Sequence, residues 1–235
     1  MKNEKKSLKS KLRAIGMKGS IGNENTAVNA LNAGQMKLFM SPAHREEILN
    51  DMCHSLKCGF VSESDLVEET INLLDESYDL YSKEVIRSEV EQCATLSIEK
   101  AKAEQMLWPE VTDCDKLDAA FEELDQLGVI AAHNFTCCLS CGRAEMEDLL
   151  NDESNSSSYY WGGCFYHSQD TLSAVDYGNL SIAFLTKDMS ENSQRMLGGL
   201  ITEVCWDYDL KASWDSSIYT RVNVELDWKR RLLVS

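Results

Sequence analysis

The sequence predicts an α+β protein in which a mixed β-sheet with packed helices follows an α-helical extension. Apolar residues recur at helical spacing between residues 43 and 107, and helix-like and strand-like segments alternate after Pro109. Only two prolines occur in 235 residues, which favours long helices and argues against a loop-rich all-β fold. We therefore expect a basic leader over residues 1–40, a helical region over 41–108 and an α/β domain over 109–235.

The helical region is expected to contain three helices. The first covers residues 43–58 and ends at Gly59, a residue that suits the left-handed position after a helix. Ser62 or Ser64 can cap the second helix. The third must end by Trp108, because the proline that follows disfavours helical geometry in the residue before it. The apolar stripe of the second helix consists of Val67, Ile71, Leu74, Tyr78 and Tyr81.

The α/β domain is expected to open with a helix over 112–128 and a strand over 129–135. A single-glycine turn joins the two, so they must run antiparallel. The next strand, 159–167, follows a connection of more than 20 residues that contains a helix, which is typical of a parallel crossover. The remaining expected elements are helix 142–150, helix 168–178, strand 179–186, helix 190–207 and a hairpin formed by 210–214 and 219–228.

Charge is unevenly distributed along the chain. Residues 1–40 carry eight Lys or Arg against two Glu, whereas residues 41–235 carry 15 against 37 Asp or Glu. An acidic body repels phosphate backbones, so we expect no binding of duplex nucleic acid there. A basic protein partner is its electrostatic complement, although the same charge can serve solubility alone. The leader is compatible with a short helix that touches nucleic acid or membrane, or with a solvated tail.

Nine cysteines raise the question of the redox compartment. Residues 1–17 are charged throughout and resemble no secretory signal, and no apolar run is long enough to span a membrane. We therefore expect a cytoplasmic protein with reduced thiols. Clustered cysteines in such a protein indicate metal binding or thiol redox chemistry.

The stretch HNFTCCLSCG, residues 133–142, predicts a structural zinc site. Its C-x-x-C places two thiolates on a tight turn, with Gly142 expected to relieve the backbone, and structural zinc takes four nitrogen or sulfur ligands. Helix 112–128 and the strands 129–135 and 159–167 should bring further ligands to one edge of the sheet. The expected ligands are Cys114, Cys138, Cys141 and His167, with Cys137 or His133 as possible substitutes.

The cysteine cluster is also compatible with two roles that involve no metal. A strand, a C-x-x-C and a helix resemble the arrangement of thioredoxin, in which the helix N-terminus lowers a thiol pKa. However, no proline follows position 109 to supply the cis-proline of that fold. Alternatively, the thiols are buried and pack as small apolar groups. We expect this packing role for Cys93, Cys164 and Cys205.

Three unusual motifs occur in order: TDCDKLDAAF, NFTCCLSCG and FYHSQDT, followed by DWKRR near the C-terminus. With them the chain resembles, over roughly residues 43–231, a bacterial family of uncharacterised proteins known as a domain of unknown function. The resemblance implies no established activity. The basic leader and the Asn/Ser-rich insert at 151–158 depart from the family pattern. The resemblance implies a motif set of Cys114, Asp115, Cys137, Cys138, Cys141, Gly142, His167, Gln169 and Asp170.

The sequence favours a non-enzymatic, acidic protein-binding module over an enzyme. It contains no phosphate-binding glycine loop, no dinucleotide fingerprint and no zinc-hydrolase or deaminase signature. The concrete hypothesis is an immunity or antitoxin-type protein, or a component of a bacterial defence system. The alternative is a cysteine- or zinc-dependent enzyme, or a thiol redox protein, that uses the CCxxC cluster. The candidate binding residues are Tyr159, Tyr160, Trp161, Gln169 and Asp170.

Overall fold

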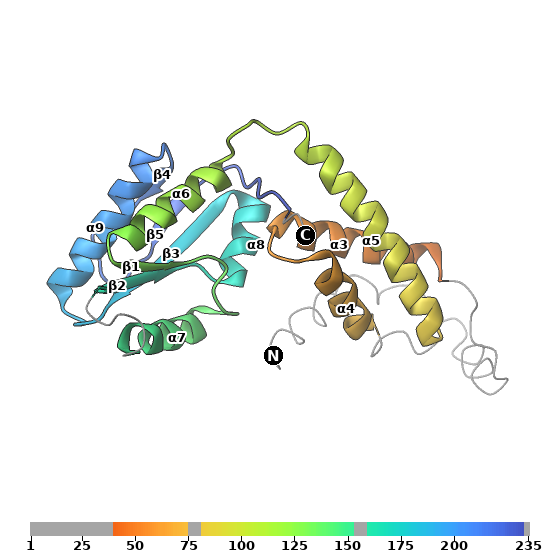
Figure 1. Ribbon diagram of the computed structural model, residues 1–235, viewed down its shortest axis with the longest axis horizontal. Coiled ribbons are helices and arrows are strands. Elements are labelled where there is room, and N and C mark those ends of the chain that lie inside the picture. Colours follow the sequence, from red (N-terminus) through yellow and green to blue (C-terminus); the bar gives the residue numbers. More distant parts are fainter. Residues whose placement is uncertain (1–39, 75–80, 153–158, 233–235) are drawn as a thin grey trace, which may run out of the picture. The chain divides into compact units, whose positions relative to one another are not determined.

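The computed structural model describes residues 40–74, 81–152 and 159–232, and the predictions for the leader and for most of the 151–158 insert lie outside them (Figure 1). The chain forms two compact units. The helical unit contains the described residues up to Leu56, Val61–Ala103 and Leu232; the α/β unit contains Lys57–Phe60 and Glu104–Arg231.

The helical unit is built from α3 (Pro42–Cys58), α4 (Glu63–Leu74) and α5 (Lys83–Gln105). The three helices confirm the predicted helical extension. Ser62 caps α4, because its Oγ accepts a hydrogen bond from the backbone N–H of Asp65 at 3.1 Å. Tyr78 of the predicted stripe lies outside the described residues. The buried core residues of this unit include Ile48, Met52, Leu56, Leu66, Ile86, Val90 and Cys93.

The α/β unit contains one mixed sheet, which confirms the predicted fold class. Its strands lie in the order β1-β2-β3-β5-β4. β1 and β2 pair in parallel, as expected for a crossover through a helix, and all other neighbours pair antiparallel. The strands are β1 (Val129–Ala132), β2 (Gly162–Phe165), β3 (Asn179–Thr186), β4 (Lys211–Ser213) and β5 (Val222–Glu225).

Helices cover both faces of this sheet. The helices of the unit are α6 (Asp113–Gln126), α7 (Leu139–Asn151), α8 (Ser168–Tyr177) and α9 (Glu191–Asp207). In Figure 1, α6 and α9 run along one face and α7 lies against the opposite one. The buried residues separate accordingly. Leu117 and Leu197 belong to the core beneath α6 and α9, whereas Met146 packs with Phe165 and Leu185 beneath α7.

The segment 227–231 that follows β5 is tied to the start of α6. The backbone N–H of Asp227 donates to Oδ2 of Asp113 at 3.0 Å, and Arg231 pairs with Asp115. Arg230 forms a two-pronged ion pair with Asp118. Asp115 and Asp118 of the TDCDKLD motif are therefore the partners of the two arginines in DWKRR, whereas Lys229 pairs with Asp227.

The loop between β1 and α7 differs from expectation in two respects. β1 ends at Ala132, not at residue 135, because Asn134 and Thr136 turn the chain with φ values of 46° and 60°. α7 begins at Leu139, so Cys141 and Gly142 belong to its first turn and not to a separate knuckle. Gly142 therefore does not relieve a turn. The space beside Phe165 accounts for the glycine, since a Cβ there would lie 2.3 Å from the ring.

Candidate metal centre

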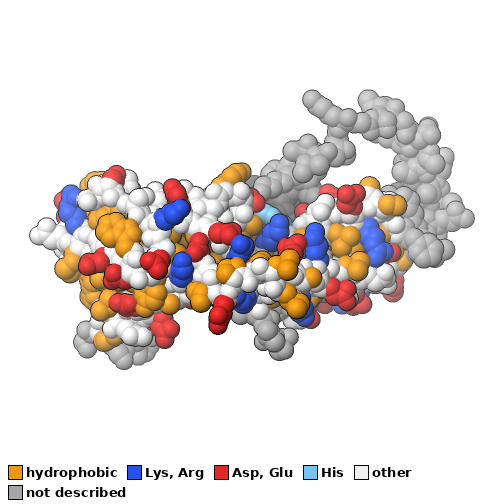
Figure 2. Space-filling model, turned by 90° about the horizontal axis from the view of Figure 1, so that it is seen from above, with side chains coloured by type: hydrophobic (Ala, Val, Ile, Leu, Met, Phe, Trp, Pro, Cys, Tyr) orange, Lys and Arg blue, Asp and Glu red, His pale blue; other side chains and the backbone are white. Residues whose placement is uncertain are grey.

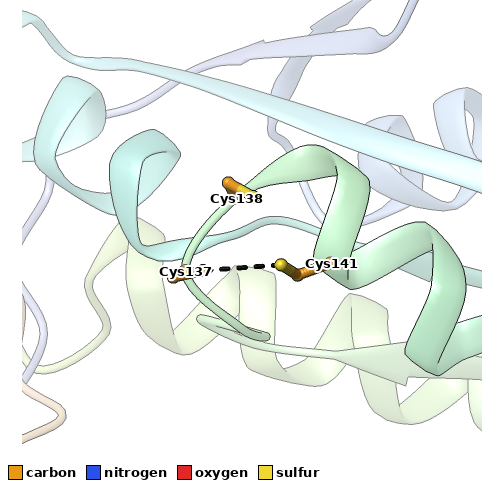
Figure 3. A group of neighbouring side chains, drawn as sticks. All are labelled: Cys137, Cys138 and Cys141. Atoms are coloured by element: carbon orange, nitrogen blue, oxygen red, sulfur yellow. Dashed lines mark hydrogen bonds between the residues drawn. The ribbon is translucent and has the colours of Figure 1, made fainter. Parts of the chain in front are cut away.

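Three cysteine thiols meet where the β1–α7 loop enters the helix. The sulfur atoms of Cys137, Cys138 and Cys141 all lie within 4.8 Å of one another. Figure 3 shows Cys137 on the loop facing Cys141 on the first helical turn, and their sulfurs are 3.7 Å apart. Cys141 is exposed and the other two are half-buried. No disulfide joins any of the three, so this group could hold a metal ion.

Backbone hydrogen bonds hold the thiol loop against the residues that follow β2. The N–H of Phe135 donates to the carbonyl of Tyr166 at 2.8 Å, and the N–H of Ser168 donates to the carbonyl of Thr136 at 3.2 Å. The Ser168 hydroxyl also donates to the carbonyl of Cys137 at 3.3 Å. These bonds compensate for the left-handed backbone at Thr136 and fix the direction in which the loop presents its sulfurs.

Side chains of α8 add to this support. The Thr171 hydroxyl donates to Oδ1 of Asn134 at 2.8 Å, and Thr171 is buried. The start of α8 is in turn anchored by Asp170, whose carboxylate pairs with Arg221 at 2.8 Å. Thr171, Asn134 and Arg221 were not predicted from the sequence. Only the left-handed propensity of asparagine after a strand signals this loop, and nothing in the sequence links Arg221 to it.

The helix N-terminus sets the electrostatics of the thiols. Cys138 occupies the N-cap of α7, where the partial positive charge of the helix favours an anion. A hydrogen bond with Ser140 and bonds with Cys141 lower the pKa of Cys138 to about 6. The same interaction with Cys138 raises the pKa of Cys141 to about 11. These interactions favour the thiolate form of Cys138 even without a metal.

His167 does not join the thiols, although the sequence predicted it as a ligand. Its Nδ1 accepts a hydrogen bond from the backbone N–H of Asp170 at 3.3 Å, and its Nε2 lies 3.1 Å from Oδ2 of Asp170. The ring thus caps α8 in a capping box. Burial lowers the pKa of His167, opposed by the charge of Asp170. Both ring nitrogens are used inside the chain, so neither is available to an ion.

Cys114 also lies apart from the thiol group. It is buried in the core beneath α6, the face of the sheet opposite to α7. Burial raises the pKa of the Cys114 thiol to about 12, which disfavours a metal-binding thiolate. The prediction that helix 112–128 runs antiparallel to strand 129–135 places Cys114 near the end of the strand at which the thiol loop begins. It does not decide which face of the sheet the helix covers, because a crossover helix and the helix before it can pack on opposite faces.

His133 is held on the α6 side as well. Its Nδ1 lies 2.9 Å from the hydroxyl of Tyr166, its Nε2 lies 3.5 Å from Asp118, and its ring stacks on Phe121 at 4.3 Å between centroids. Burial lowers the pKa of His133 to about 4. This residue is a packed, half-buried histidine and not a substitute ligand for the thiol group.

Replacing His133 with Gln should reduce the acid sensitivity of the α/β unit. Between about pH 6.5 and 4 the unfolded chain binds a proton at His133 and the folded chain does not, so stability falls as the pH falls through this window. The lost stability is at most about 3.5 kcal/mol, at about 1.4 kcal/mol per pKa unit between 6.5 and about 4. Urea unfolding at pH 7 and pH 4.5, followed by tryptophan fluorescence, measures it, since all five tryptophans lie in the α/β unit.

His54→Gln, in the helical unit, is the control for this measurement. It should leave the pH dependence of the α/β transition unchanged. Equal pH dependence of the wild type and of His133→Gln would contradict the lowered pKa of His133 in the folded chain.

The aromatic candidates 159–161 contact the end of α6. The Tyr159 hydroxyl donates to the carbonyl of Gln126, and Tyr160 donates to Asp125 at 3.1 Å. The indole of Trp161 donates to the carbonyl of Leu127 at 3.1 Å. Their polar atoms therefore serve the fold. The remaining binding candidates differ in burial: Gln169 is exposed and Asp170 is buried.

The α/β unit thus combines a mixed sheet, covered by helices, with a group of three cysteines at a helix N-terminus. This group could hold a metal ion. The chain belongs to the family described as Domain of unknown function (DUF6891), which matches residues 41–232. The resemblance to an uncharacterised domain family is thereby confirmed. No curated protein and no solved structure matches the chain. Within the part of the chain that the structure describes, no helix has the length and apolar character needed to cross a membrane.

Proposed function

We propose that this protein is a metal-dependent binding module in which Cys137, Cys138 and Cys141 hold a zinc ion. The observation that carries the proposal is the mutual proximity of the three sulfurs within 4.8 Å. Tetrahedral zinc with Zn–S bonds of about 2.3 Å places neighbouring sulfurs about 3.8 Å apart. The 3.7 Å between the sulfurs of Cys137 and Cys141 is close to this value, and far above the about 2.05 Å of a disulfide.

The site differs from the closed four-ligand staple that the sequence suggested. Its three donors come from one short segment, so zinc would fix the β1–α7 loop and the first turn of α7 locally. Zinc would also stabilise the thiolate form of all three cysteines, whose mutual repulsion it neutralises. Loss of the metal should therefore loosen this segment without unfolding the whole α/β unit.

Elemental analysis of protein purified without added metal tests the proposal. We expect about one zinc per chain for the wild type, and at least about a tenfold loss of zinc affinity for Cys141→Ser, because zinc prefers thiolate and imidazole donors. Cys205→Ala is the matched control. Its thiol is buried in the core beneath α9, and burial raises its pKa to about 12, so the variant should retain zinc. Metal-free wild type that also fails to bind added zinc would contradict the proposal.

The acidic body supports a basic protein as the partner of this module. Residues 41–235 carry an excess of 22 negative charges, and Figure 2 shows acidic side chains distributed among basic ones over the visible face. Such a surface attracts a basic partner at long range and repels duplex nucleic acid. An immunity-type protein or a defence-system component that binds a basic partner would need such a surface. Pull-down followed by salt titration tests it, since an electrostatic complex weakens steeply between low and physiological salt.

A thiol redox function is the second candidate, supported by one specific observation. Cys138 has a pKa lowered to about 6, Cys141 has a raised pKa, and the two form a C-x-x-C at a helix N-terminus. In the redox case metal-free protein reacts with iodoacetamide at Cys138 at pH 6. An added disulfide such as oxidised glutathione also converts Cys138 and Cys141 into a disulfide and is itself reduced to two thiols. Protection of the same thiol by stoichiometric zinc would favour the metal centre.

A further inference from the structure

We infer that the fourth coordination position of this metal centre takes a neutral nitrogen donor from outside the described α/β unit, the imidazole of a histidine on the partner protein. The inference rests on the proposed function and specifies the ligand of the same site. Zinc completes a tetrahedral shell with four donors, and this segment supplies three. Three observations indicate the chemistry of the fourth donor. They are the engagement of the other Cys and His side chains of the α/β unit, the exposure of the thiols, and the charge of the site.

The α/β unit offers no fourth cysteine or histidine to the site. Among its described residues, no Cys, His, Asp or Glu atom joins the three sulfurs. His167 uses both ring nitrogens with Asp170, and His133 is engaged by Tyr166 and Asp118. The remaining thiols of the unit are Cys58, Cys114, Cys164 and Cys205, and burial raises the pKa of each.

The exposure of the thiols permits a donor on another protein. Cys141 is exposed and lies in the first turn of α7, and Cys137 and Cys138 are half-buried in the loop beside it (Figure 3). Hydroxyls line the site: Ser140 lies 3.2 Å from the sulfur of Cys138, and Ser168 contacts the carbonyl of Cys137. A side chain that approaches from solvent therefore meets the ion without displacing an apolar cover.

Charge selects the chemistry of the donor. Three thiolates and a divalent ion leave one net negative charge, and residues 41–235 carry 37 acidic against 15 basic residues. A carboxylate or a further thiolate adds a second negative charge to the site, which the surrounding field opposes. Imidazole brings a preferred zinc donor atom without adding charge. It is also a side chain that a basic partner protein can present.

Cobalt substitution of the full chain tests this inference. Co²⁺ replaces zinc in thiolate sites and reports each thiolate by charge-transfer absorption and the coordination geometry by visible bands. Cys141→Ser should lower the charge-transfer intensity by about one third if three thiolates bind the ion. The Co²⁺ protein is then titrated at pH 7 with imidazole, acetate and mercaptoethanol at constant ionic strength, with Cys205→Ala as the control.

The expected result is that imidazole shifts the visible bands at constant charge-transfer intensity, and does so at about tenfold lower concentration than acetate or mercaptoethanol. Two results would overturn the inference: no response to any ligand, which indicates a fourth donor from the chain, or tighter binding of mercaptoethanol with a rise in charge-transfer intensity. Failure to bind Co²⁺ or Zn²⁺ at all would instead refute the proposed function and the inference together.

Discussion

Asp118→Ala is expected to lower the free energy of unfolding of the α/β unit by about 2–3 kcal/mol, because it leaves a buried guanidinium without its carboxylate. The Arg230 side chain is only 12% exposed, whereas Asp118 is 46% exposed. Arg230 also lies over the rings of Phe60 and Trp228, at 4.6 and 5.6 Å from their centroids. These contacts hold the cation in place when its partner is removed, so it cannot simply rotate into water.

Arg230→Met is the matched comparison, and its smaller effect is the informative part of the prediction. Methionine keeps most of the contact with Phe60 and Trp228 and removes the charge that needs a partner. The carboxylate of Asp118 that remains is solvated, since nearly half of its side chain is exposed. We expect Arg230→Met to cost less than half as much as Asp118→Ala. Urea unfolding followed by tryptophan fluorescence measures both, and equal costs would contradict this account.

Gly142→Val is expected to destabilise the α/β unit by about 3 kcal/mol and to weaken zinc binding together with it. A Cβ at position 142 would lie 2.3 and 2.7 Å from two ring atoms of Phe165. Phe165 is fully buried and packs edge-on against Phe135, so its ring cannot move aside. The first turn of α7 must then shift, and Cys141 moves with it.

Gly199 in α9 provides the control for this substitution. A Cβ there meets nothing within 4 Å, so Gly199→Ala should gain up to about 1 kcal/mol from helix propensity alone. Denaturation gives both stabilities, and competition with a chromophoric chelator gives the zinc affinity. A Gly142→Val variant with wild-type stability and wild-type zinc affinity would show that position 142 is not under steric constraint.

The sequence was sufficient for the elements and for their order. Apolar spacing predicted α6, β3 and α9 within a residue or two, because each has a cap or glycine at its ends and a regular buried face. β1, β2, β5 and α7 were each misplaced by about three residues at one end or both. Asn134 and Thr136 have a left-handed backbone, and no strong sequence pattern predicts it. Hydrogen bonds with residues that follow β2 stabilise this backbone only in the folded chain.

The candidate site was only partly predictable from the sequence. The C-C-x-x-C spacing alone brings Cys137, Cys138 and Cys141 together, since all three lie on one loop and one helical turn. Ligands from distant segments depend on which face of the sheet each helix covers, and periodicity does not encode that choice. Cys114 does not join the site because α6 covers the other face of the sheet. His167 does not join it because its imidazole caps α8.

The attachment of segment 227–231 to residues 57–60 and to α6 has a consequence for biosynthesis. The Trp228 indole donates to the carbonyl of Lys57, and Arg230 covers Phe60, so the first and last portions of the α/β unit meet only when the intervening chain exists. A nascent polypeptide that emerges from the ribosome can assemble α3 to α5 early. The contacts of its α/β unit with segment 227–231 can form only after translation of residue 231.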